Sequence, residues 1–234
     1  MTDFRPGGFN TIPVVIKNLV IINVLVYFAQ ITFARNPSFN MEDIFALHDI
    51  RSAYFKPHQV ITYMFLHGGW AHLFFNMFAL WMFGSVLENL WGPKRFLTFY
   101  MLSGLGATAL HLAILYFDLT PVWEQFYRLP LEEQQRLIGH PRFFPNIPTV
   151  GASGAVFGCL AAFGYLFPNS LLYIYFLFPI KAKWFVLIYA GMELYLGIQN
   201  SAGDSVAHWA HLGGALVGFL LVWFWNKNNR RTFY

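Results

Sequence analysis

The sequence predicts an all-α polytopic membrane protein that crosses the bilayer with six helices. Two observations support this fold class. Among the 234 residues, 57% are hydrophobic and only 11% are charged, whereas an ordinary soluble domain has about 45–50% and about 25%. The apolar residues are also gathered into six stretches rather than spread along the chain. The single cysteine, Cys159, excludes an intramolecular disulfide and a metal site built of cysteines alone.

The six stretches approach the length of about 20 residues that a helix needs to cross the hydrocarbon core. They cover residues 13–34, 70–90, 95–117, 150–167, 183–199 and 206–225, and the fourth is short. A further apolar segment, Leu171 to Ile180, is too short to span and lies between prolines, so we expect a buried or interfacial connection. No repeat or low-complexity linker divides the chain, which predicts one domain over residues 1–234.

The distribution of charge predicts how the chain is oriented. If the N-terminus lies inside, the inner segments collect most of the Lys and Arg residues, and the outer segments carry an acidic excess. By the positive-inside rule, both termini are then cytoplasmic. The formal net charge of +4 is thereby explained by topology and does not indicate a nucleic-acid partner. The first stretch is too long for a cleavable signal peptide, and the plain six-span form favours a bacterial cytoplasmic (inner) membrane.

Two of the outer loops are long, residues 35–69 and residues 118–148. The first loop contains apolar residues throughout, so we expect it to pack on the membrane or to dip into it. The second contains a polar stretch, Leu131 to Leu137, which is consistent with a short helix. The role of this second loop stays open.

Polar residues within membrane spans are costly and by default indicate function. The informative ones are His72 and Asn76 in the second stretch, Ser153 in the fourth, and His208 and His211 in the sixth. These three stretches all run from the outside to the inside, and each residue lies near the outer end of its stretch. At a rise of about 1.5 Å per residue, Ser153 and His211 share a depth of roughly 5–10 Å below the outer surface. The three stretches thus bring a hydroxyl, an imidazole and an amide to one layer.

Ser153 and His211 are the candidate nucleophile and base. A serine hydroxyl becomes nucleophilic when a base takes its proton, and an imidazole titrates near neutrality as such a base requires. Gly151 and Gly154 flank the serine and Gly214 follows the histidine, so little side-chain material keeps the two helices apart. The alternative for Ser153 is ordinary packing of small residues at a helix interface.

His72 and Asn76 are spaced i, i+4 and therefore lie on one face of a helix. Both side chains donate hydrogen bonds, and with the backbone N–H of Ser153 they are candidates for an oxyanion hole. A polar clamp between helices is the alternative, above all for Asn76. His208, one turn before His211, is more simply interpreted as a hydrogen-bonded or interfacial histidine.

No aspartate is expected near this layer, so the residues predict a Ser/His dyad rather than a triad. The base must then be oriented by packing. Phe157, four residues after Ser153 on the same helix face, is placed to stack on the ring of His211, and the alternative is that it fills the core. His67 precedes the second stretch and either hydrogen-bonds the loop there or has no specific role.

Taken together, these residues resemble the rhomboid family of intramembrane serine proteases. Each motif is modest, but their order along the chain and their shared depth are specific. The matching strings are residues 67–76 (HGGWAHLFFN), Gly84 with Glu88, residues 91–96 (WGPKRF), residues 151–158 (GASGAVFG), and residues 210–214 (AHLGG) with Gly218. They extend over the second to sixth stretches, and the six-span form is also that of the basic bacterial rhomboid.

The resemblance implies a six-helix rhomboid-like bundle with Ser153 as nucleophile and His211 as general base and acid. It further implies that a transmembrane protein substrate is hydrolysed near its outer end, in a cavity open to the outside, with no metal or organic cofactor. The lipid bilayer is then the surrounding partner, and the oligomeric state is not predicted. The implied oxyanion hole is His72 and Asn76 with the Ser153 amide, and the implied supporting residues are Gly151, Gly154, Phe157 and Gly214.

Two features depart from the family's pattern. Phe157 stands where some members have a hydrogen-bonding tyrosine, and the loop 118–148 is long and charged for the family. The first outer loop resembles the family's membrane-embedded loop, and the fifth stretch resembles its proposed lateral gate.

Two other functions stay open. One is a polytopic metal or ion carrier, although carriers often use acidic ligands within their spans and this chain has few. The other is an inactive rhomboid-like protein that binds membrane proteins without cutting them. The carrier would bind its cation with His67, His72, His208 and His211.

Overall fold

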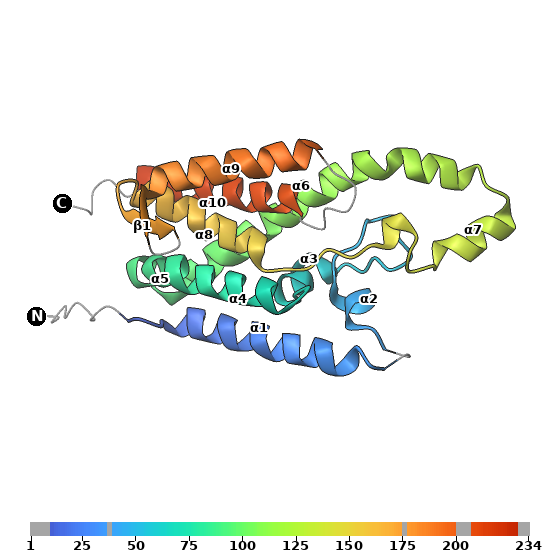
Figure 1. Cartoon of the computed structure of the whole chain (residues 1–234), viewed down its shortest axis with the longest axis horizontal. Coiled ribbons are helices and arrows are strands. Elements are labelled where there is room, and N and C mark those ends of the chain that lie inside the picture. Colours follow the sequence, from blue (N-terminus) through green and yellow to red (C-terminus); the bar gives the residue numbers. More distant parts are fainter. Residues whose placement is uncertain (1–9, 37–38, 175–176, 200–206, 229–234) are drawn as a thin grey trace, which may run out of the picture.

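The computed structural model describes residues 10–36, 39–174, 177–199 and 207–228 as a helical bundle with one hairpin (Figure 1). The main helices are α1 (Val14–Phe33), α6 (Pro93–Tyr127), α8 (Ser153–Leu166), α9 (Ala182–Gln199) and α10 (His208–Asn228). The second stretch is formed by α4 (Trp70–Ala79), the π-helical turn η2 (Leu80–Gly84) and α5 (Ser85–Trp91). The loops carry α2 (Met41–Phe45), α3 (Gln59–Thr62), η1 (Tyr63–Phe65), α7 (Leu131–Ile138) and η3 (Phe144–Asn146), and strand β1 (Leu171–Ile174) pairs antiparallel with β2 (Phe178–Lys181).

Four of the described helical runs are long and apolar enough to cross a membrane. They are Val14–Phe33, Trp70–Trp91, Pro93–Tyr127 and His208–Lys227, with mean hydropathies of 2.0, 1.4, 1.4 and 1.2. The helix of the fourth stretch, α8, is apolar and shorter, and α9 has 18 residues. The predicted all-α membrane bundle is therefore confirmed. Whether α8 and α9 also span, and whether the chain forms one domain, stays a prediction.

The first residue expected for the sixth stretch, residue 206, lies outside the described residues. The described part of that stretch begins with α10 at His208. The start of α1 and the end of α10 lie at one end of the bundle, and the long loops 35–69 and 118–148 lie at the other (Figure 1). We call the latter the loop end. Helices α4, α8 and α10 all begin there.

Two elements differ from the sequence-based expectation. Helix α6 continues to Tyr127, past the expected end at residue 117, because Leu119, Trp123 and Phe126 keep a helical spacing and bury one another in a small second core. The segment expected as a buried or interfacial connection forms an antiparallel hairpin with an exposed apolar surface, so it is not buried, and its position at the membrane interface stays a prediction. Pairing of the two strands satisfies their backbone groups without burial of the segment.

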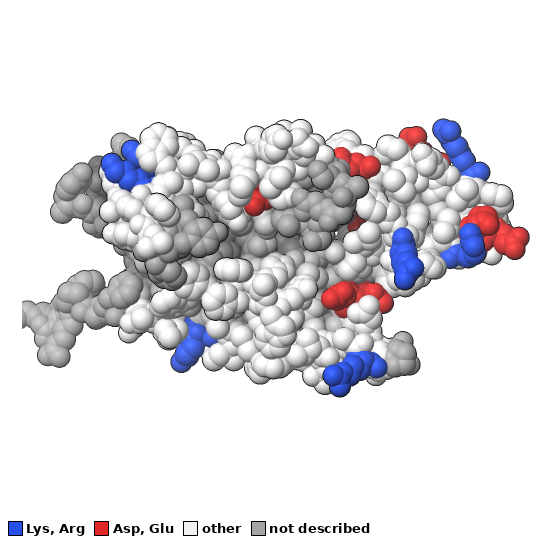
Figure 2. Space-filling model, in the orientation of Figure 1, with Lys and Arg blue, Asp and Glu red and all other residues white. Residues whose placement is uncertain are grey.

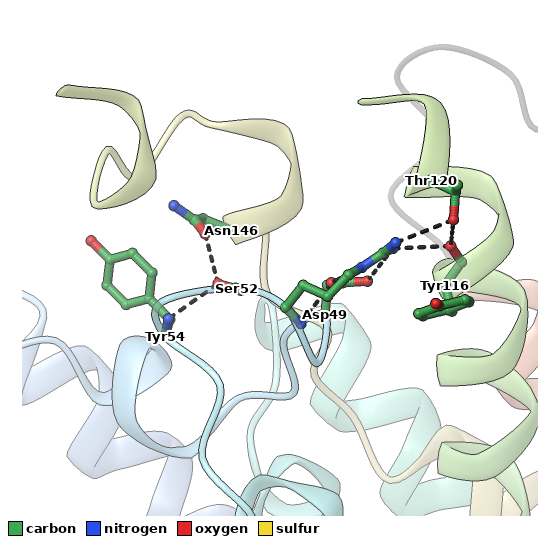
Figure 3. A network of polar contacts seen from close by, with 7 residues as sticks. Asp49, Ser52, Tyr54, Tyr116, Thr120 and Asn146 are labelled. Carbon is green, nitrogen blue, oxygen red and sulfur yellow. Dashed lines mark hydrogen bonds and ion pairs between the residues drawn. The ribbon is translucent and has the colours of Figure 1, made fainter. Parts of the chain in front are cut away.

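A polar network joins the two long loops (Figure 3). Arg51 pairs with both carboxylate oxygens of Asp49 at 3.0 and 3.1 Å and also donates to the Tyr116 carbonyl and the Thr120 hydroxyl, at 2.9 and 3.2 Å. A second link runs from the Ser52 hydroxyl to Asn146, at 2.6 Å. The loop 118–148 is thus anchored on the loop 35–69.

Charged side chains are concentrated away from the middle of the bundle. On the face shown in Figure 2, the centre is nearly uncharged, and most Lys, Arg, Asp and Glu side chains lie toward the loop end. Glu88 of α5 is a buried charge at the end of the bundle where α1 starts, and its two oxygens accept hydrogen bonds from the backbone N–H groups of Val15 and Ile16, each at 2.9 Å. This carboxylate satisfies the first turn of α1 and interacts favourably with its dipole.

Candidate active site

Helices α8 and α10 touch through glycine residues. A Cβ atom at Gly214 would overlap the carbonyl oxygen of Gly154, and one at Gly218 would lie 2.6 Å from the Cα atom of Gly158. The close apposition expected from the sequence is present. It brings the first turns of two helices, both at the loop end, within reach of each other.

Ser153 and His211 meet across this interface. The His211 Nε2 atom lies 2.7 Å from Ser153 Oγ, a hydrogen-bond distance. The ring of Phe157 stacks on the imidazole of His211 with centroids 4.2 Å apart and planes 7° from parallel. His211 thus lies beside Ser153, and Phe157 stacks on His211, as expected from the sequence.

The loops hold the backbone segment that leads into Ser153. Thr149 and Leu47 exchange two backbone hydrogen bonds, of 2.8 and 3.0 Å, and the N–H of Gly151 donates to the Tyr63 carbonyl at 3.0 Å. Gly151 has φ +132°, a conformation that glycine tolerates best. The first outer loop therefore packs against the protein and fixes the start of α8.

His72 borders the same space as the serine. The N–H of Gly68 donates to His72 Nδ1 at 3.2 Å, so the ring proton is assigned to Nε2. A Cβ atom at Gly151 would lie 2.9 Å from His72 Nε2 and 3.5 Å from Ser153 Oγ. The missing side chain of Gly151 therefore leaves a small gap between a hydrogen-bond donor and the serine hydroxyl.

Asn76 is buried on the same face of α4, one turn beyond His72. One N–H of its amide donates to the His72 carbonyl at 2.9 Å, a contact within its own helix. An amide nitrogen carries two hydrogens, so this contact leaves a second one for another acceptor.

The sequence-based expectation that packing alone orients His211 is wrong. Glu193, in α9, places its Oε2 atom 2.9 Å from His211 Nδ1, and its side chain is buried. The expectation considered only aspartate, whereas the carboxylate beside His211 belongs to a glutamate of the fifth stretch. The sequence does carry a signal for Glu193, because it is an acidic residue within a predicted membrane span, and such residues indicate function by default.

The two histidines without an assigned role lie beside this site. The Nδ1 atom of His208 is 2.6 Å from the same oxygen of Glu193, which agrees with its interpretation as a hydrogen-bonded histidine. His67 is buried in the loop before α4, with its ring centroid 5.2 Å from that of His72. Its burial, with a smaller effect of His72, lowers the pKa of His67 to about 4.

The histidines do not gather as the carrier hypothesis expects. Within the described part of the chain, the group with metal-ligand spacing is Glu193, His208 and His211, whose ligand atoms lie within 4.8 Å of one another. His67 and His72 instead face each other at the start of α4.

A family model described as the Rhomboid domain matches residues 54–228. The chain is similar to "Rhomboid protein 1, mitochondrial" of Saccharomyces cerevisiae, 31% identical over 173 residues that cover 72% of this chain and 42% of the relative. For "Rhomboid-like protein 11, chloroplastic" of Arabidopsis thaliana the identity is 28% over 229 residues, 89% of this chain and 64% of the relative. For "Rhomboid protease GluP" of Bacillus subtilis it is 29% over 161 residues, 69% of this chain and 24% of the relative.

These alignments bear on the whole protein and on its location. The chain spans less than two thirds of the length of each of these three relatives. The yeast and Arabidopsis relatives are named as mitochondrial and chloroplastic proteins. These names point to an organellar membrane, so the expectation of a bacterial cytoplasmic membrane is wrong.

Proposed function

Because the chain belongs to the rhomboid family, we propose that it is an intramembrane serine endopeptidase that cleaves the transmembrane helices of membrane-protein substrates. The observation that carries the proposal is the 2.7 Å contact between Ser153 Oγ and His211 Nε2. A hydroxyl paired with an imidazole nitrogen at this distance is the arrangement that general-base activation of a nucleophile requires.

In the first step, Ser153 Oγ attacks the carbonyl carbon of the scissile peptide bond, and His211 Nε2 takes the hydroxyl proton. The product is a tetrahedral intermediate whose former carbonyl oxygen carries the negative charge. The stack of Phe157 on His211 keeps the imidazole in the plane from which it reaches the serine.

The oxyanion is bound by the side-chain N–H groups of His72 and Asn76 and by the backbone N–H of Ser153. His72 supports this role most directly, because its Nε2–H faces the gap at Gly151 beside the serine hydroxyl. Ser153 is the first residue of α8, and the first N–H groups of a helix have no partner within it. The start of α8 therefore adds a favourable dipole to the hydrogen bonds.

In the second half of the reaction, His211 returns its proton to the leaving amine and the C–N bond breaks. The acyl chain is then bound to Ser153 as an ester. A water molecule that gives a proton to His211 attacks this ester carbon. The bond between the acyl carbon and Ser153 Oγ then breaks, His211 returns the proton to Oγ, and the new carboxyl end is released. None of these steps uses a metal or an organic cofactor.

The substrate class follows from the geometry of a membrane helix. A transmembrane helix keeps its peptide bonds inside its own hydrogen-bond ladder, so the protease must receive a locally unwound segment. Ser153 lies at the start of α8, at the loop end of the bundle. We therefore expect substrates with Gly, Pro or small polar residues near the end of the helix on that side.

The test is cleavage in reconstituted vesicles. The full-length protein is mixed in liposomes with a single-span reporter that carries a Gly-Pro break near one end of its helix, with and without EDTA. We expect cleavage at one site, which gives two fragments of the reporter, no effect of EDTA, and no fragments with Ser153→Ala. An EDTA-sensitive reaction or a fully active Ser153→Ala variant contradicts the proposal.

The same experiment separates the two other functions. A carrier that uses the cluster of Glu193, His208 and His211 binds a transition metal in the intact protein and cuts no reporter. An inactive binder retains the reporter without cutting it, and Ser153→Ala changes nothing.

A further inference from the structure

We propose that Glu193 is a positioning residue that fixes the orientation and the tautomer of His211 for proton transfer from Ser153. This inference rests on the proposed function. It adds Glu193 to the pair of Ser153 and His211, so that three side chains form a line of hydrogen bonds. The line runs across three helices, from α8 through α10 to α9.

The contacts define where the proton of the imidazole lies. Glu193 Oε2 is 2.9 Å from His211 Nδ1, and Ser153 Oγ is 2.7 Å from His211 Nε2. A carboxylate only accepts hydrogen bonds, so the Nδ1 atom carries the hydrogen and donates it. The Nε2 atom then has a free lone pair, which accepts the hydrogen of the Ser153 hydroxyl. The other neutral tautomer has no lone pair on Nε2 and cannot act as the base.

The carboxylate is itself held in place by a residue that does not take part in this line. His208 Nδ1 lies 2.6 Å from the same oxygen atom, Glu193 Oε2. Gly197, one turn after Glu193, makes room for this histidine, because a Cβ atom there would lie 3.3 Å from the Cβ atom of His208. Glu193 is only 3% exposed, and a buried carboxylate needs such partners.

A second contact from α9 supports the same histidine. Tyr189, one turn before Glu193, stacks on Phe157 with centroids 5.1 Å apart, and Phe157 stacks in turn on His211. Helix α9 therefore contacts the Nδ1 atom of the imidazole directly through Glu193, and it supports the face of the ring indirectly, through the stack of Tyr189 on Phe157. When His211 takes the serine proton, it becomes a cation, and the adjacent carboxylate stabilises it.

The chain offers a matched control for a test of this role. Glu88 is also a buried carboxylate, 4% exposed, but it caps α1 and lies outside the site. We compare Glu193→Gln with Glu88→Gln, both in the full-length protein in mild detergent. The measurements are the second-order rate of acylation by a fluorophosphonate probe and the Tm.

We expect acylation of Glu193→Gln to be about 10²–10⁴-fold slower than that of the wild type. Glu88→Gln lowers the Tm but keeps the acylation rate within about threefold, since it removes only a helix cap. His208→Gln removes the other hydrogen-bond partner of Glu193 but keeps the contact between Glu193 and His211. A purely structural cluster predicts instead that Glu193→Gln and His208→Gln lower the rate and the Tm in parallel.

The tautomer of His211 gives a readout that a structural role does not affect. In protein labelled with ¹⁵N-histidine, with the His211 signals assigned by His211→Gln, we expect the hydrogen on Nδ1 in the wild type. A glutamine side chain both accepts and donates, so Glu193→Gln should show a mixture of tautomers. This measurement on the wild type remains decisive if the variant fails to fold.

Two results overturn the inference: a hydrogen on Nε2 of His211 in the wild type, or a wild-type acylation rate in folded Glu193→Gln. Failure of the proposed function has a different signature. If the folded wild type is not labelled at all, the serine is not activated and the function itself is wrong. If only Ser153→Ala and His211→Ala lose labelling, the function stands without a role for Glu193.

Discussion

Gly154 in α8 lies directly against Gly214 in α10, where a Cβ atom on the latter would overlap the carbonyl oxygen of the former. Gly154 follows Ser153 in the sequence, and Gly214 lies less than one turn after His211. The contact of two backbones without side chains therefore sets the helix separation at the point where serine and histidine meet.

Substitution of Gly214 by alanine tests this spacing. In Gly214→Ala, the added methyl group forces α8 and α10 apart, at a cost of about 1–3 kcal/mol for an overpacked interface. We expect a lower Tm and loss of most fluorophosphonate labelling. The matched control is Gly191→Ala in α9, where an added Cβ meets no atom within 4 Å. Equal labelling rates in the two variants would contradict the account.

The stack of Phe157 on His211 predicts a graded effect. Phe157→Leu removes an aromatic contact of about 0.5–1.5 kcal/mol, so we expect acylation to slow by roughly 2–10-fold. Phe157→Tyr keeps the ring and should react within about twofold of the wild type. The acylation rates of the two variants at one temperature are compared. Similar rates for leucine and tyrosine would mean that Phe157 only fills the core.

The oxyanion assignment predicts a loss in kcat. His72→Ala and Asn76→Ala should each lower the single-turnover rate of reporter cleavage by about 10²–10³-fold, the usual effect of removing one oxyanion donor. The alternative role as a helix clamp predicts a lower Tm at an unchanged rate. A variant that cleaves at full rate assigns its residue to packing, an outcome most relevant to Asn76 because its amide also bonds the His72 carbonyl.

The anchor of the loop 118–148 predicts a local change in stability. Arg51→Met leaves the carboxylate of Asp49 buried without its partner and removes the contacts with Tyr116 and Thr120. We expect faster hydrogen exchange in residues 118–148, measured by mass spectrometry. Arg136→Met is the control, because its ion pair with Glu133 is solvent-exposed and contributes little. The same exchange rates in both variants would show that Arg51 does not hold the loop.

The sequence predicts the fold class and the central contact of the site because both depend on local patterns. Apolar stretches of membrane length specify helices, and the direction of each stretch gives the depth of its polar residues. That reasoning places Ser153 and His211 in one layer, and their hydrogen bond agrees with it. The stacking of Phe157 follows from its i, i+4 spacing with Ser153.

The parts that sequence reasoning misses depend on contacts between distant elements. Glu193 reaches His211 because of how α9 is rotated about its own axis where it packs on α10. Residue spacing within a single helix does not determine that rotation. The extension of α6 is stabilised by Phe143, far along the chain, which packs on Trp123. The hairpin of β1 and β2 depends on strand pairing, which competes with burial for the same short apolar segment.

The central claim is that Ser153 is a nucleophile activated by His211, and the most direct test uses a fluorophosphonate probe on the purified full-length protein. The wild type, Ser153→Ala and His211→Ala are compared after their fold is verified by Tm. We predict stoichiometric labelling of the wild type at Ser153 and none in either variant. A folded wild type that is not labelled, or labelling that persists in His211→Ala at the wild-type rate, would contradict the claim.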